Sequence, residues 1–117
     1  MRNIEERRER YMQDALPTKI GGIAANMARV GSISAWPETQ NVAFDLLEES
    51  KHFIEWIAME ADIETTGALI ELQLQLVLWQ LHLDKSWSSK DSRTEIGRRA
   101  KEYSTDLLQR SGLLNDQ

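Results

Sequence analysis

Residues 71–83, ELQLQLVLWQLHL, alternate apolar and polar side chains almost one for one. Such alternation is typical of a half-buried β-strand, but leucine and glutamine are good helix formers, whereas strands prefer β-branched and aromatic residues. The neighbouring segments also have helical patterns, and a single long strand would have no partner with which to pair. We therefore predict a helix in this part of the chain.

The predicted helix has two apolar sides instead of one. At about 100° per residue, its apolar residues separate into two stripes on roughly opposite sides. The first stripe holds Leu72, Leu76, Trp79 and Leu83, and the second holds Ile70, Leu74, Val77, Leu78 and Leu81. A surface helix needs only one apolar face. We therefore expect this helix to lie between its own bundle and a second partner, which is either the N-terminal segment or another copy of the chain.

Three further segments place apolar residues at helical spacing, at about 17–33, 38–62 and 91–111. In the second of them, the apolar face that we expect to be buried includes Leu46, Leu47, Ile54 and Ile57. Residues 2–15 are mostly charged, and pairs such as Glu6 and Arg10 at i,i+4 favour a helix there too. The predicted fold class is all-α: an antiparallel four-helix bundle (about 17–33, 38–62, 65–85 and 91–111) with an additional N-terminal helical arm. We expect one helical domain over residues 1–117, with the arm at 1–15 and the bundle at 16–114.

Small residues suggest how two of these helices meet their neighbours. Gly21, Ala25 and Ala28 share one face of the 17–33 helix, where another backbone could approach closely. At the other end of the chain, Gly112 is suited to end the last helix in a left-handed conformation. The residues after it, Leu113 and Leu114, are then able to fold back onto the bundle.

Composition excludes several classes of protein. The chain of 117 residues contains no cysteine, which excludes disulfides, zinc–thiolate sites and thiol nucleophiles. No apolar run approaches the ~18 residues that span a bilayer, and the charged start MRNIEERRER lacks the apolar core of a secretory signal. We expect a cytoplasmic protein without membrane contact. No phosphate-binding loop, nucleophile motif or cofactor motif is present, so no cofactor and no catalytic residue is predicted.

Acidic residues on the 38–62 helix are the candidates for metal chemistry. Glu49 and His52 have the Glu-x-x-His spacing of di-iron bundles. The segment LLEES (46–50) resembles the start of the magnesium-binding motif of helical nucleotide pyrophosphohydrolases, a resemblance that implies hydrolysis through Glu48, Glu49 and Glu60. His52 stands where that motif has its third acid, and the later Glu-x-x-Asp element is missing. The interpretation we favour is a solvated acidic face.

Residues 85–110 contain seven bases and four acids, so a basic face on the last helix is a candidate nucleic-acid site. Its candidates are Arg93, Arg98, Arg99 and Lys101. Interspersed acids and the lack of an aromatic ladder favour a solvated face instead. The four tryptophans are expected mainly as core anchors. Trp56 and Met59 lie on the outer side of their helix and, with Phe44, are candidates for a partner surface.

Two resemblances extend this reading. GIAANMA (22–28) resembles the S-I-P-x-N-I-A segment of four-helix proteins encoded in ribosomal-RNA intervening sequences, which implies ring assembly and contact with nucleic acid. GGIAANMARVGSIS, LLEESKHFIEW, LIELQLQLVLW and SGLL are similar to segments of a group of short, uncharacterised all-helical cyanobacterial proteins. The second resemblance runs over most of residues 15–114 and implies a helical fold without a known activity.

The sequence favours a non-enzymatic, homo-oligomeric interaction or scaffold protein. We expect a homo-oligomer, in particular a dimer, whose subunits meet through residues 65–84. Leu74, Leu78 and Leu81 are expected in the interface. The alternative to a second copy of the chain is an unidentified protein partner. The alternatives are a degenerate magnesium-dependent nucleotide hydrolase and a nucleic-acid-binding four-helix protein.

Overall fold

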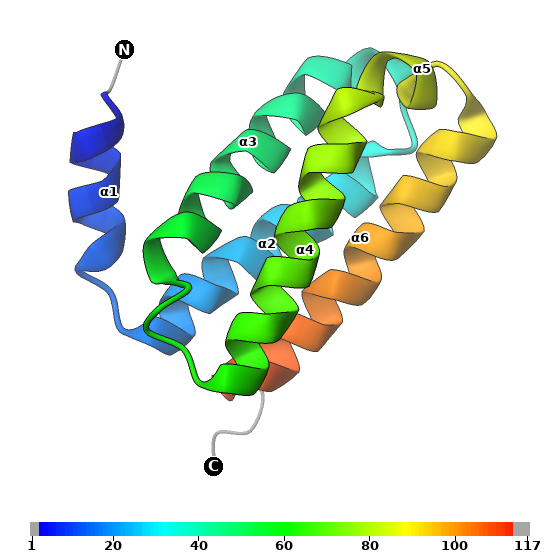
Figure 1. Cartoon of the computed structure of the whole chain (residues 1–117). Helices are drawn as coiled ribbons and strands as arrows, with labels where there is room; N and C mark the ends of the chain where they lie inside the picture. Colours follow the sequence, from blue (N-terminus) through cyan, green and yellow to red (C-terminus); the bar gives the residue numbers. More distant parts are fainter. Residues whose placement is uncertain (1–2, 114–117) are drawn as a thin grey trace.

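The computed structural model describes residues 3–113, and this part of the chain is helical without a strand. The elements are α1 (Ile4–Met12), α2 (Leu16–Ile33), the short 3₁₀ helix η1 (Pro37–Thr39), α3 (Gln40–Ile57), α4 (Ile63–Leu81), α5 (Leu83–Trp87) and α6 (Lys90–Ser111). Figure 1 shows α2, α3, α4 and α6 lying side by side, with α1 beside α3 at the edge of the molecule. The all-α prediction is confirmed.

The apolar stripes of α3 and α4 form much of the core. Helix α3 buries the predicted face, which includes Leu46, Leu47, Ile54 and Ile57. Helix α4 begins earlier than predicted, because Asp62 caps it by accepting a hydrogen bond from the Thr65 backbone N–H at 2.7 Å. It buries Leu72, Leu76 and Trp79 of the first predicted stripe, together with Leu69.

The end of α4 differs from the prediction. The helix stops at Leu81, and His82, with φ −115° and ψ 19°, turns the chain into α5. Leu83, which we placed on the first stripe of the same helix, is buried from α5 instead. The apolar pattern continues across this break, and for this reason the pattern alone does not reveal it.

Helices α2 and α6 pack closely along their lengths. A Cβ atom at Gly97 would lie only 2.8 Å from the Ser34 Cβ and 3.2 Å from the Gly31 carbonyl oxygen. Ala25 and Ala28 are exposed, so the predicted small-residue face is wrong at these two positions. The close approach of two backbones occurs further along α2, at Gly31.

The C-terminal cap of α6 is as predicted. Gly112 adopts φ 82°, in the left-handed region, and ends the helix. Leu113 folds back, and its Cδ1 atom would lie 2.8 Å from a Cβ atom at Gly21. Leu114, and with it the predicted end of the bundle at residue 114, lies outside the described residues.

The N-terminal arm packs on α3. The ring of Tyr11 stacks on Phe53 with centroids 3.9 Å apart, and its hydroxyl donates to the Lys19 carbonyl at 2.5 Å. Burial raises the pKa of Tyr11 well above its usual value. The buried Lys19 ammonium in turn lies 2.9 Å from the Glu60 carboxylate. The arm therefore covers α3 and leaves the outer side of α4 uncovered.

No residue of α1 is fully buried, and the main apolar contact of this arm is the ring of Tyr11 stacked on Phe53. Tyr11→Ala is expected to increase the rate of tryptic cleavage after Arg7, Arg8 and Arg10 several-fold, with little change in the melting temperature of the rest of the protein. Mass spectrometry of timed digests measures this rate. Tyr11→Phe, which keeps the stacked ring, is the control and should cleave nearly as slowly as the unmodified protein. Equal cleavage of all three proteins would contradict this role of Tyr11.

Candidate functional site: the exposed face of α4

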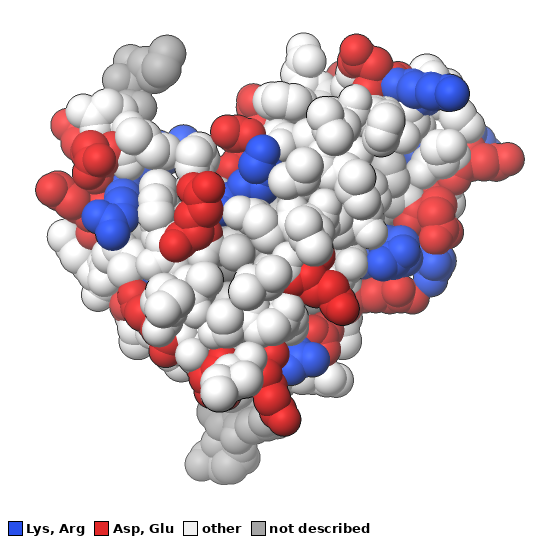
Figure 2. Space-filling view, viewed as in Figure 1, with Lys and Arg blue, Asp and Glu red and all other residues white. Residues whose placement is uncertain are grey.

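The second apolar stripe of α4 is exposed. Ile63 is 90% exposed, Leu81 70% and Leu74 63%, while Ile70, Val77 and Leu78 lie between 38% and 53%. We call these six residues the α4 stripe. Figure 2 shows a broad surface without Lys, Arg, Asp or Glu over the upper part of α4, and acidic side chains near its lower end. Within residues 3–113, the rest of the chain leaves this face open to solvent.

The positions along the stripe follow a regular spacing. Positions 63, 67, 70, 74, 77 and 81 alternate steps of four and three residues, which is the spacing at which two helices pack along a common seam. Gly67 occupies one of these positions, and a Cβ atom there would meet nothing within 4 Å. The seam extends over five turns, about 27 Å.

The polar side chains on the α3 side of the stripe join α4 to α3. The Gln73 amide donates to the Lys51 carbonyl at 3.2 Å. The Gln80 amide donates to Glu48 at 3.1 Å, and its oxygen accepts from the Lys51 ammonium at 2.6 Å. The hydrogen bond from Gln80, and then the nearby positive charge of Lys51, hold the pKa of the Glu48 carboxyl below its usual range. The glutamines of the alternating motif therefore fix the orientation of α4.

The size of the stripe suits an interaction surface. About half-exposed aliphatic side chains contribute on the order of 100 Å² each, so the stripe offers roughly 500–700 Å² of apolar surface. This is at the upper end of the largest apolar patch on a typical monomer, and it approaches the ~800 Å² that each partner contributes to a standard interface.

The other two predicted interface residues occupy different environments. Met59, in the connection before α4, is 94% exposed. Trp56 is only partly exposed, because the rings of Tyr11 and His52 lie against it. The ring centroids are 5.9 Å apart for Tyr11 and Trp56 and 5.7 Å apart for His52 and Trp56. The arm thus covers part of the surface for which Trp56 was a candidate.

The candidate metal ligands have separate partners. Glu49 pairs with Arg7 and accepts a hydrogen bond from Asn26 at 3.0 Å, and Glu60 pairs with Lys19. His52 lies between Glu48, at 3.3 Å, and Glu55, at 3.4 Å. Glu48, Glu49 and His52 line one groove of about 480 Å³, together with Arg7 and Arg29. No group of three or more His, Cys, Asp or Glu side chains in the described part of the chain is arranged to hold a metal ion.

The candidate basic residues do not form one basic face. Arg93 is buried and donates to the carbonyl oxygens of Ser34 and Trp87, both at 2.9 Å. Arg98 bridges Glu95 and Glu102 at 2.7 and 2.5 Å. Its hydrogen bonds hold the pKa of Glu95 below its usual range.

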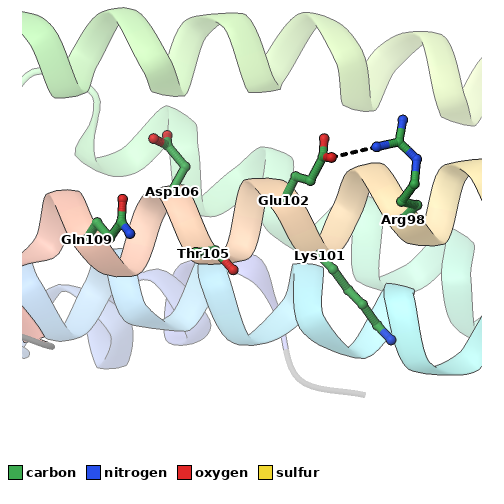
Figure 3. Close-up of a pocket in the computed structure, with 6 residues that line it drawn as sticks. All are labelled: Arg98, Lys101, Glu102, Thr105, Asp106 and Gln109. Atoms are coloured by element: carbon green, nitrogen blue, oxygen red, sulfur yellow. Dashed lines mark hydrogen bonds and ion pairs between the residues drawn. The ribbon is translucent and has the colours of Figure 1, made fainter.

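The outer face of α6 mixes both signs of charge. A depression of about 530 Å³ lies along this helix. The side chains that line it, shown in Figure 3, are Arg98, Lys101, Glu102, Thr105, Asp106 and Gln109. Arg99 donates to the Tyr103 hydroxyl at 3.1 Å, and the stem of Lys101 covers Gly31. Paired charges on one helix face give a phosphate backbone little net positive charge to bind.

None of the helices within residues 3–113 is both long and apolar enough to cross a membrane. Comparisons with protein-family models, with curated proteins and with solved structures gave no match for this chain.

Proposed function

We propose that this protein is a non-enzymatic interaction module that forms a homodimer through the α4 stripe. The observation that carries the proposal is that α4 buries one apolar face in its own subunit and exposes a second along its whole length. Apolar patches of this size on soluble proteins mark interaction sites. Burying the stripe removes from water the largest run of exposed aliphatic side chains on the described residues.

A second copy of the chain is the partner that this surface fits best. Two stripes would bury on the order of 1,000–1,400 Å² in total, which reaches the lower range of specific interfaces. The stripe itself is uncharged, so two copies with a formal net charge of −5 each can meet there without bringing like charges into the centre of the contact. A twofold interface uses the same patch on both subunits and needs no other partner.

We also propose that α2, α3, α4 and α6 form an antiparallel four-helix bundle to which α1 is added. The short connection between α3 and α4, at residues 58–62, supports antiparallel neighbours at this point. In this arrangement α4 is the helix that carries the outward apolar face.

The proposal is tested by replacing Leu74, Leu78 and Leu81 together with glutamine. We expect the unmodified protein to sediment as a dimer at tens of micromolar. Each lost leucine contact is worth about 1–2 kcal/mol, so the triple variant should dissociate at least a hundredfold more readily. It should keep its helical circular dichroism and a cooperative melt, because these side chains lie outside the core.

The matched control replaces three exposed apolar residues of other elements, Ile4, Trp36 and Val42, with glutamine. This control should remain a dimer. A monomeric unmodified protein, or a triple α4 variant that stays dimeric, would contradict the proposal. Unfolding of the α4 variant would show instead that the stripe belongs to the core of the subunit.

A further inference from the structure

We propose that the two α4 helices pair antiparallel about a twofold axis between residues 75 and 76, with Leu81 of each subunit seated beside Gly67 of the other. This inference rests on the proposed homodimer and adds its geometry. It follows from three features of α4: the spacing of the stripe, the gap at Gly67 and the unequal charge of the two helix ends.

The position of the axis defines which residues of the seam face each other. With the axis between residues 75 and 76, Leu74 faces the partner's Val77 and Ile70 faces the partner's Leu81. Each layer then pairs one leucine with one β-branched residue. Large side chains thus lie opposite smaller or stiffer ones, as in helix pairs that pack side chains into the gaps of the facing helix.

Gly67 provides a gap at the place where this register requires one. Glycine weakens a helix interior relative to alanine, and nothing in the subunit itself occupies the space of a Cβ atom at this position. Packing within the subunit therefore does not explain the glycine. Leu81 is the most exposed residue of the stripe after Ile63. In this register it faces the partner's Ile70, and the gap at Gly67, one turn before Ile70, forms one end of the hollow that receives its side chain.

The charges at the two ends of α4 favour antiparallel pairing. Asp62 and Glu64 are exposed on either side of Ile63, and Arg110, the base near both, is hydrogen-bonded to Asp106 at 2.8 Å. A parallel pair would bring the acids of both subunits together. An antiparallel pair places them near the far end of the partner's α4.

That far end carries no excess of acid. His82 and Lys85 are exposed there, and the Asp84 carboxylate accepts a hydrogen bond from Gln40. Antiparallel pairing also sets the positive end of each helix dipole beside the negative end of the other. Both electrostatic effects act in the same direction.

Cysteine cross-linking tests the direction of pairing, and the absence of native cysteine makes it unambiguous. Ile70→Cys and Leu81→Cys are prepared as separate single variants and oxidised alone and mixed. In the antiparallel register, equivalent positions are offset by 11 residues, about 16 Å, which is beyond the ~7 Å reach of a disulfide. We expect cross-linked dimers only in the mixture.

The possible outcomes separate this inference from the proposed function. Cross-linking of each variant alone, with little in the mixture, would show a parallel dimer and would overturn the inference while the proposed function stands. A protein that sediments as a monomer would overturn both. Sedimentation of the two cysteine variants under reducing conditions confirms that each still forms the dimer being tested.

Gly67→Leu tests the seat of Leu81. The new side chain has free space within the subunit but fills the gap that the partner's Leu81 needs, so we expect the dimer to weaken at least tenfold without a lower melting temperature for the monomer. Gly22→Ala is the control, because its added Cβ makes only ordinary contacts of 3.7 and 3.8 Å and lies on α2. Unchanged or tighter association of Gly67→Leu would overturn this part of the inference.

Discussion

Replacing Trp87 with alanine is expected to lower the free energy of unfolding by about 3–5 kcal/mol, the cost of removing a large buried aromatic side chain. Trp87 is 1% exposed and its ring N–H donates to the Thr39 hydroxyl at 3.2 Å. Its carbonyl also accepts a hydrogen bond from the buried Arg93. The indole therefore joins α5 to η1, and the backbone at Trp87 is held to Arg93 of α6.

Urea unfolding followed by circular dichroism at 222 nm measures this effect, at one fixed protein concentration because the proposed dimer would add to the apparent stability. Since small domains are stable by only about 5–15 kcal/mol, Trp87→Ala should be partly unfolded under mild conditions. Trp87→Phe keeps most of the apolar volume, loses the hydrogen bond and should cost about half as much or less. A loss below about 1 kcal/mol for Trp87→Ala would contradict a core role.

Gly97→Val should lower the free energy of unfolding by about 3 kcal/mol or more, at the upper end of what overpacking costs. The side chain would meet the Ser34 Cβ and the Gly31 carbonyl oxygen, and neither is the free end of a flexible side chain. Relief therefore requires α2 and α6 to move apart along a contact that both helices use extensively.

The matched substitution is Gly67→Val, which places the same side chain at another helical glycine with open space around it. Both are best compared in the protein that already carries glutamine at Leu74, Leu78 and Leu81, so that association does not contribute. Gly67→Val should change stability by less than about 0.5 kcal/mol there, because valine and glycine differ little in helix propensity. Similar losses at the two positions would show that helix propensity, and not the close contact of α2 with α6, controls the result.

Local periodicity was sufficient to predict the long helices and the buried faces of α3 and α4. The face of α3 that includes Leu47 and Ile54, and the buried face of α4 that includes Leu72 and Leu76, were both predicted from spacing alone. The exposed stripe of α4 was also predicted as a second apolar face. The pattern does not determine whether the arm or another chain covers this second face, because the packing of α1 on α3 depends on long-range contacts of Tyr11.

Other features depended on tertiary contacts that a pattern does not contain. Gln73 and Gln80 are polar positions of the alternating pattern, and the pattern does not indicate that both are hydrogen-bonded to α3. The burial of Arg93 had a signal that was missed, because it precedes Ile96 and Ala100 by three and seven residues on the same side of α6. Counting it among surface bases ignored this helical position.

The hydrogen bonds of Gln73 and Gln80 have a consequence for how this protein can change. They hold α4 in place from the side, independently of the residues on its outer face. Substitutions among the stripe residues can therefore change the surface that we propose as the interface while the core that determines folding stays the same. In protein engineering, this separation makes α4 a place where new assembly specificities can be selected without first restoring lost stability.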